Sequence, residues 1–250
     1  MNEIFKVEIA LASASDAFLA KSAGAFRVEL NSALSLSGLT PSMGEFLLAR
    51  ESGIKIIAMV RPRRSGFLYD NFEFKTMLKD AELFMKNGAS GIAFGFLTRD
   101  GKIDKEKTKA MVKAVGDGET VFHRAFDVAQ SDFRPSLETL IDCSVTRVLT
   151  GGKAKTAILG AKNILDMNVF SAGAIEILPG GGIRAKNALT LVKETGCPVV
   201  HASCARLEPD ITEELGKAIG VDFTPQGLER GYFRLDKKEL TDLVRTGMSK

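Results

Sequence analysis

Three residues able to carry out acid–base or anion chemistry lie together in the segment VFHRAFDV, at residues 121–128. They are His123, Arg124 and Asp127, and they follow an apolar run typical of a buried strand. Histidine titrates near neutral pH, so His123 is a candidate for proton transfer. Asp127 is a second candidate, or it caps a helix that follows the strand. The chain has only two histidines, and the other, His201, stands in a similar run, VVHAS.

Carboxylates and arginines stand in or just after other apolar runs. Glu8 lies in KVEIAL and Glu29 in FRVEL, and Arg61 and Arg63 follow IKIIAMV with the same strand parity. A carboxylate inside a strand costs free energy unless it is paired. Glu8 and Glu29 therefore either join the histidines as acids or bases, or form a salt-bridge layer with Arg61 or Arg63 that plugs the interior of the fold.

Two glycine runs, in RVLTGG and PGGGI, each follow an apolar run and precede a helical segment. Glycine lets backbone N–H groups approach an anion closely, and a helix N-terminus adds partial positive charge. Tight turns without a ligand are the alternative. The residues predicted to bind a small anion are Arg61, Arg63, Arg124, Thr150, Gly151, Gly180, Gly181 and Gly182.

A metal site is not predicted, and no cofactor motif is present in the sequence. Two histidines without a third ligand make an incomplete zinc site, and strand parity does not bring Cys204 to His201. Neither GxGxxG in its proper context nor GxxxxGK[ST] occurs. The three cysteines form no CxxC pair, which indicates a reduced, intracellular protein.

The elements that position these residues alternate regularly along the chain. Helix-period segments separate short apolar runs that lack polar alternation, as expected of strands covered on both faces. This alternation predicts an α/β protein, a TIM (β/α)8 barrel that forms a single domain over residues 1–250, with a doubly wound open sheet as the alternative. An irregular loop insertion is expected at 206–235, before a last amphipathic segment. The predicted strands are 6–11, 26–30, 54–60, 91–96, 120–124, 147–150, 176–180 and 199–203. In such a barrel the chemistry lies at the C-terminal ends of the strands.

Composition narrows the classes of function. The net charge is +3 and basic residues are interspersed with acidic ones, so nucleic-acid binding is not expected. No apolar run reaches the length of a membrane span, and the first residues carry charges where the apolar region of a secretory signal would stand. We therefore expect a cytoplasmic protein without membrane contact.

Several segments together resemble the CutC family of copper homeostasis proteins. They are RVEL with the following GLTPS, then RPR, GFLTRDGKID, FHRAFD, RVLTGG, PGGGI and HAS, in an order that runs from about residue 7 to 204. The resemblance implies a cytoplasmic TIM-like barrel, self-association and a role in copper handling. It also implies copper-binding cysteines near the ends of the first two strands, where this sequence has Ala10 and Asn31. Neither residue can act as a thiolate ligand for Cu(I), so copper is suggested by the resemblance alone.

Three hypotheses follow from the sequence. The first is a copper-handling protein that binds a metal ligand. The second is a barrel enzyme that acts by acid–base chemistry on a small anionic or carbohydrate-like molecule, as a lyase, isomerase or hydrolase. The third is a scaffold barrel whose mouth is salt-bridged. For the enzyme, the candidate catalytic residues are His123, Glu29, Asp127, Glu8 and His201.

Overall fold

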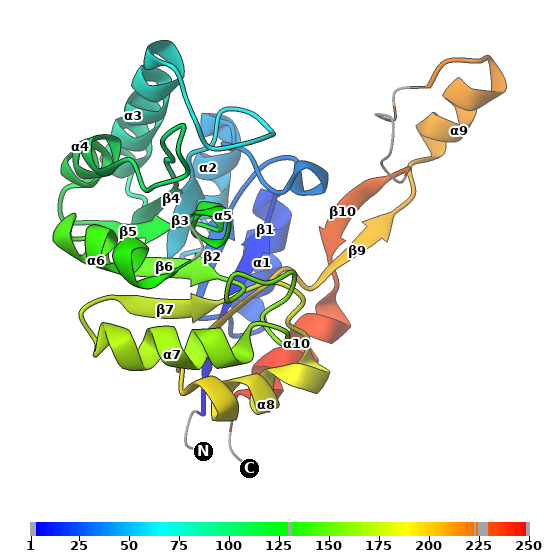
Figure 1. The fold of residues 1–250 in the computed structure, drawn as a ribbon. Coiled ribbons are helices and arrows are strands. Elements are labelled where there is room, and N and C mark those ends of the chain that lie inside the picture. The colour runs from blue at the N-terminus through cyan, green and yellow to red at the C-terminus, as the bar shows by residue number, and fades with distance from the viewer. Residues whose placement is uncertain (1–3, 130–131, 223, 225–229, 249–250) are drawn as a thin grey trace.

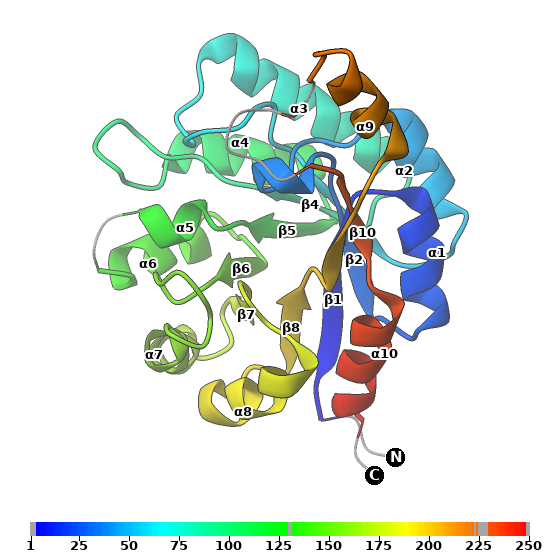
Figure 2. The same cartoon turned by 90° about the vertical axis from the view of Figure 1, so that its right-hand side faces the viewer.

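The structure is a computed structural model that describes residues 4–129, 132–222, 224 and 230–248. Eight parallel strands curl into a barrel with the helices on its outside (Figures 1 and 2), which confirms the predicted (β/α)8 fold. The strand order is β7-β6-β5-β4-β3-β2-β1-β8, and an isolated bridge between Gly180 and His201 joins the two ends. The barrel strands are β1 (Lys6–Leu11), β2 (Arg27–Leu30), β3 (Ile56–Met59), β4 (Gly91–Phe94), β5 (Glu119–Phe122), β6 (Arg147–Thr150), β7 (Glu176–Pro179) and β8 (Val199–Ala202).

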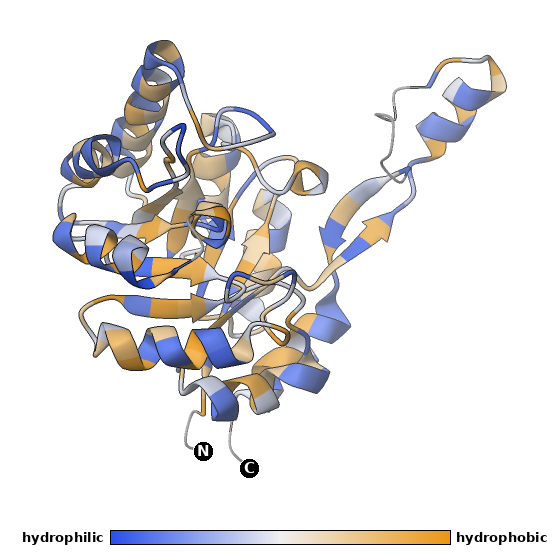
Figure 3. Cartoon of the chain, in the orientation of Figure 1, coloured by the Kyte–Doolittle hydropathy of each residue, from blue (hydrophilic) through white to orange (hydrophobic). Residues whose placement is uncertain are grey.

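The strands form because both of their faces are buried. In Figure 3 the central strands are mostly apolar, whereas the helices around them carry polar residues on their outer sides. Outward-facing strand residues such as Ile9, Val28 and Phe122 pack under the helices in one large core. A second, smaller apolar cluster includes Met59 and Leu149. The other members of this cluster stand at strand positions that, like those of Met59 and Leu149, point to the inside of the barrel. They are Ile57, Ala93, Val121, Leu178 and Val199.

The helices that follow the strands begin and end at recognisable signals. In α3 (Asn71–Lys86) the Asp70 side chain accepts hydrogen bonds from the Phe72 and Glu73 amides, and Glu73 binds the Asp70 amide in return. The helix then ends before Gly88, whose φ is +88°. The other helices are α1 (Ala14–Ser22), the 3-10 turn η1 (Leu34–Leu36), α2 (Met43–Arg50), α4 (Lys105–Val115), α5 (Ala125–Val128), α6 (Arg134–Asp142), α7 (Ala161–Ser171), α8 (Ala185–Thr195), α9 (Ile211–Ala218) and α10 (Lys237–Thr246).

An irregular loop insertion is expected at 206–235, and the described residues of this segment include two strands and a helix. Strand β9 (Ala205–Glu208) pairs with β10 (Tyr232–Leu235) in an antiparallel ribbon, and α9 lies between them. The three elements form an arm that projects from the side of the barrel where β6 and β7 end (Figure 1). The sequence did not indicate the ribbon, because each of its strands has only four residues, too few to give a clear hydrophobic period.

After the arm the chain returns to the barrel. Helix α10 buries Leu240, Leu243 and Val244 and packs against α8, so it closes the ring of helices. The Ile4 amide donates a hydrogen bond to the Gly247 carbonyl over 2.7 Å, which holds the two ends of the described chain side by side. Within the described residues, no helix is both long enough and apolar enough to span a bilayer.

Candidate functional site

A cavity of about 520 Å³ opens at the C-terminal ends of the barrel strands. Its volume falls in the range of small-molecule sites. Its walls combine polar groups with apolar side chains, among them Met59, Phe67, Leu149 and Ile183. The predicted site residues that line it are Glu29, Arg61, His123, Arg124, Asp127, Gly181, Gly182 and His201. Glu8, Arg63, Thr150, Gly151 and Gly180 are not in its wall.

His123 follows β5 and is 4% exposed. The Ala125 amide donates a hydrogen bond to its Nδ1 over 3.1 Å, while its Nε2 has no hydrogen-bond partner among the described residues. Burial, together with the positive charge of Arg61, lowers the pKa of His123 to about 3. The ring is therefore neutral at physiological pH and is not the neutral-pH titrating group that the sequence suggested.

Glu29 on β2 is 3% exposed and faces the same cavity. Its Oε1 accepts a hydrogen bond from Asn31 Nδ2 over 3.0 Å, and its Oε2 is buried without a hydrogen-bond partner in the described part of the chain. Burial raises the pKa of Glu29 above the ordinary glutamate value, against the opposing influence of His201. A carboxyl group whose pKa is shifted by burial in a cavity is a candidate acid or base.

Glu8 lies beneath the cavity and supports His201. The Nδ1 of His201 is 2.7 Å from one oxygen of Glu8, and the other oxygen accepts a hydrogen bond from Arg27 Nε. Burial alone would raise the pKa of Glu8, but the hydrogen bond from His201 and the charge of Arg27 lower it to about 2. Burial also opposes a charged His201, yet the carboxylates of Glu29 and Glu8 raise its pKa above the ordinary value. Both shifts favour the ionic forms of the pair, a carboxylate on Glu8 and a protonated ring on His201.

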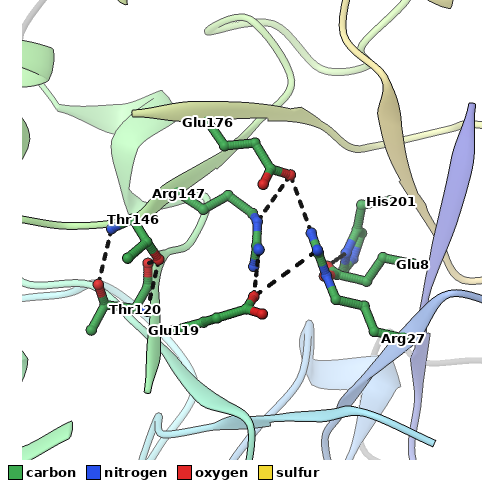
Figure 4. Close-up of polar contacts among 8 residues, drawn as sticks. All are labelled: Glu8, Arg27, Glu119, Thr120, Thr146, Arg147, Glu176 and His201. Carbon is green, nitrogen blue, oxygen red and sulfur yellow. Dashed lines mark hydrogen bonds and ion pairs between the residues drawn. The ribbon is translucent and has the colours of Figure 1, made fainter. Parts of the chain in front are cut away.

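Below this pair the barrel interior contains a buried ion network (Figure 4). Arg27 also contacts Glu176 over 3.2 Å, and Arg147 bridges Glu176 over 3.0 Å and Glu119. The side chains of Arg27 and Arg147 are 3% and 4% exposed, whereas those of Glu119 and Glu176 are about one third exposed. A salt-bridge layer thus exists, as one prediction required, but it lies below the open cavity.

The arginines of this layer differ from the predicted ones. Arg61 lines the cavity and donates hydrogen bonds to the carbonyls of Leu36, Gly38 and Ser65, so it holds the loop that contains η1. The prediction that Arg61 and Arg63 point the same way was wrong. Arg63 binds Glu73 at the start of α3. Strand β3 ends at Met59, so strand parity no longer applies at these positions.

Asp127 binds the loop that follows β6 and does not cap its own short helix. Its carboxylate accepts hydrogen bonds from the Thr150 hydroxyl and from the amides of Gly151 and Lys153. The first glycine run therefore binds an anion as its geometry suggested, but that anion is a side chain of the same protein. Thr150 and Gly151 are positioning groups in this arrangement.

Arg124 spans the two glycine runs at the edge of the cavity. Its Nε binds Asp127 over 2.6 Å, and its Nη2 donates a hydrogen bond to the Ala154 carbonyl over 2.9 Å. A Cβ atom at Gly181 would lie 3.1 Å from Nη1, and one at Gly151 would lie 2.7 Å from Nη2. Glycine at both positions thus makes room for the guanidinium, whose Nη1 lies beside the wall of the cavity formed by Gly181 and Gly182.

Glu8, Glu29 and His201 offer ligand atoms that lie within 4.8 Å of one another, a spacing at which a metal ion can bind. The two oxygens of Glu8, however, already bind Arg27 and His201. A metal ion that used all three residues would have to displace these bonds. The arrangement therefore fits a hydrogen-bonded proton pair better than a metal centre.

The cysteines are poor candidates for ligands. Cys143, Cys197 and Cys204 are free and buried. Burial raises the pKa of Cys197 to about 11 and that of Cys204 to about 12, so the thiolate forms that bind soft metals are disfavoured. Ala10 and Asn31 both line the cavity, and neither side chain carries a thiol.

Sequence reasoning missed the charged residues under the cavity, Arg27 and Arg147 with Glu119 and Glu176. A signal was present, because each of these residues is the first of its strand: RVEL, RVLT, ETVF and EILP. Four strands that begin with a charge on the same side of a barrel imply a charged layer at its closed end.

Comparisons of the sequence and of the structure with known proteins point to one family. The sequence model of the CutC family matches residues 5–206. A family protein CutC from Treponema denticola is 48% identical over 83% of this chain and 85% of its own length. The human copper homeostasis protein cutC homolog is 38% identical over 80% of this chain and 73% of its own length. A solved structure of CutC from Streptococcus agalactiae has a TM-score of 0.76 and 30% identity, covering 80% of this chain and 98% of that one.

Proposed function

This chain belongs to the CutC family, and from that premise we propose that it is a cytoplasmic barrel enzyme that binds a small anionic, oxygen-rich molecule and moves protons on it. One observation carries the proposal: His123 Nε2 and Glu29 Oε2 are both buried without a hydrogen-bond partner in the part of the chain that the structure describes, and both belong to side chains that line one cavity. Leaving a buried polar atom unpaired costs about 1–3 kcal/mol. A ligand that pairs both atoms accounts for their placement.

The anionic part of the ligand belongs at the Arg124 side of the cavity. Arg124 is held by Asp127 and by the Ala154 carbonyl, so its Nη1, beside Gly181, is already oriented when a ligand arrives. Gly181 and Gly182 keep the neighbouring wall free of side chains. Arg61 adds positive charge from a second wall. Together these groups suit a phosphate or carboxylate.

The part of the ligand that exchanges protons belongs beside Glu29 and His201. Glu29 has a raised pKa and one unpartnered oxygen, as a general acid or base requires. His201 lies beside it, and its contact with Glu8 favours a protonated ring. Its positive charge stabilises negative charge that develops on a bound substrate.

Binding of simple anions tests this function. Isothermal titration with glycerol 3-phosphate and with inorganic phosphate should give saturable heats, and Arg124→Met should weaken binding at least ~10-fold. Arg63→Met is the matched control, because Arg63 lies outside the cavity and should leave the affinity unchanged. If neither anion binds, and Arg61→Met only destabilises the fold, the scaffold hypothesis replaces the enzyme.

The relatives whose names refer to copper homeostasis suggest a link of this chain to copper. We propose that the link runs through its chemistry on a small molecule, since Ala10 and Asn31 offer no thiolate and the three thiols are buried. Titration with Cu(I) against a competing chelator should give no stoichiometric uptake. Uptake that disappears in Cys204→Ser would instead establish direct copper binding.

Self-association remains part of this proposal. On the arm, Ile211, Leu215 and Ile219 are 74%, 64% and 79% exposed and recur at every fourth residue along α9 and its C-cap. This is the surface at which we would first test it, by sedimentation of the whole protein and of an Ile211→Asp, Leu215→Asp variant. An unchanged sedimentation coefficient would exclude the arm from any interface.

A further inference from the structure

The hydrogen bonds of His123 fix which of its nitrogens carries the proton. The Ala125 amide can only donate, so His123 Nδ1 must accept with its lone pair. The proton of the neutral ring is therefore on Nε2, the atom without a partner among the residues described. His123 thus presents one N–H donor to the ligand and no acceptor.

The neighbours of His123 hold the ring in this orientation. Gly95 follows β4, and a Cβ atom there would collide with Cε1 and Nδ1 of the ring. Phe67 packs against the other part of the ring, with the centroids 5.0 Å apart. Arg61 stacks over Phe67 at 5.4 Å, so a fixed cation lies close by and opposes a second proton on the imidazole. A neutral imidazole held in this way can polarise a carbonyl group.

Glu29 supplies the complementary group. Its Oε1 is occupied by Asn31, which leaves the buried Oε2 as the atom available to a ligand. When ionised, this carboxylate accepts a proton. The cavity therefore combines a fixed hydrogen-bond donor, the Nε2–H of His123, with a base, the carboxylate of Glu29.

We propose that the cavity takes short α-hydroxycarbonyl compounds that end in a phosphate or carboxylate, with the carbonyl oxygen on His123 Nε2–H and the neighbouring C–H facing Glu29. This inference rests on the proposed function and specifies its substrate class. The anion lies at Arg124 and Gly181. Polyols without a carbonyl can occupy the same space, but they leave the His123 donor without a strongly polarised acceptor.

The step that this arrangement performs is enolisation, and it balances without an oxidant or a metal. The C–H bond breaks and its proton moves to Glu29. The C–H electron pair forms a carbon–carbon double bond, and the carbonyl π pair moves to oxygen. The resulting oxyanion accepts the hydrogen bond from His123 Nε2–H. Return of the proton to the same carbon completes an exchange. Return to the adjacent carbon completes an isomerisation when the proton of the neighbouring hydroxyl also moves to the enolate oxygen, so that the carbonyl and the hydroxyl change places.

Proton NMR in D2O tests the step directly. Dihydroxyacetone phosphate and hydroxypyruvate are the probes, and loss of their C–H signals is followed against the background without protein. We expect exchange well above background, reduced at least ~100-fold in Glu29→Gln, because a general base contributes about 10²–10⁴. Arg63→Met, which alters an arginine outside the cavity, should exchange at the wild-type rate.

Nitrogen-15 NMR gives a readout that does not depend on turnover. With only two histidines in the chain, His123→Asn assigns both rings. We expect His123 in the Nε2–H form at neutral pH, and a proton on its Nδ1 would overturn the inference. Saturable binding of glycerol 3-phosphate without C–H exchange of either probe would also overturn it, while the proposed function would stand. Absence of binding by all these anions would remove the proposed function as well.

Discussion

The burial of a neutral histidine should make this protein sensitive to mild acid. His123 has an ordinary pKa of 6.5, and burial and the charge of Arg61 lower it to about 3 in the folded protein. Below pH 6.5 His123 takes up a proton in the unfolded chain but stays unprotonated in the folded protein. The contribution of His123 to stability is therefore present above pH 6.5 and is lost as the pH falls. The loss is about 1.4 kcal/mol per pH unit.

Other titrating groups affect this window differently. The raised pKa of His201 makes its contribution complete below its unfolded value of 6.5, so it adds no slope there. Glu8, with a pKa of about 2, loses its contribution only below its ordinary value of 4.5. Glu29 opposes the trend, because its raised pKa lets the folded protein take up a proton first. A comparison with a variant that lacks only His123 separates these effects.

The assay is urea unfolding followed by circular dichroism from about pH 7 to pH 5, for the wild type and His123→Asn. Between pH 6.5 and about pH 5 the wild type should lose about 2 kcal/mol more unfolding free energy than the variant. Arg63→Met should keep the wild-type pH dependence. Parallel pH curves for the wild type and His123→Asn would show that His123 has the same pKa in the folded protein as in the unfolded chain, and would refute the reasoning.

Three further outcomes are expected. Gly95→Ala should displace the His123 ring and destabilise the protein by about 1–3 kcal/mol, measured by urea unfolding, because the added methyl group collides with the imidazole. Arg27→Met should cost about 3–5 kcal/mol in the same assay at neutral pH, because it leaves the buried Glu8 carboxylate without its guanidinium; a change below about 1 kcal/mol would mean that His201 alone suffices. Ile211→Ser should change the unfolding free energy of the monomer by no more than about 0.5 kcal/mol, since this side chain is 74% exposed on α9, and a larger loss at a concentration where the protein sediments as a monomer would place α9 against the barrel.

The barrel could be predicted from the sequence because its strands are buried on both faces. A segment such as IIAM in β3 is continuously apolar, and its length and flanking residues separate it from a helix. The arm could not be predicted in the same way. In β9 the segment ARLE has no fully buried residue, and its pairing with YFRL depends on residues far along the chain. A strand without buried residues has no regular spacing of apolar residues, so its sequence does not indicate a strand.

For the site, the sequence could predict only which residues lie at the ends of the strands. His123 and Glu29 gather in one cavity because the barrel brings the strand ends together. Their protonation states depend on neighbours that topology alone does not specify. The tautomer of His123 follows from one backbone amide, at Ala125. The direction of Arg63 follows from how the chain turns after Met59.

The ion network under the cavity affects the protonation of the residues at the open end of the barrel. Replacing a buried ion pair by apolar residues of similar volume is often neutral for stability, so stability alone does not account for Arg27 and Arg147 inside a barrel. An apolar filling would, however, leave Glu8 without a cation below it, and burial would then favour its protonated form. A neutral Glu8 would no longer favour the protonated form of His201, and the influence by which His201 lowers the pKa of Glu29 would weaken. Arg27 thus connects the carboxylates at the closed end of the barrel, such as Glu176, with the proton-transfer groups at its open end.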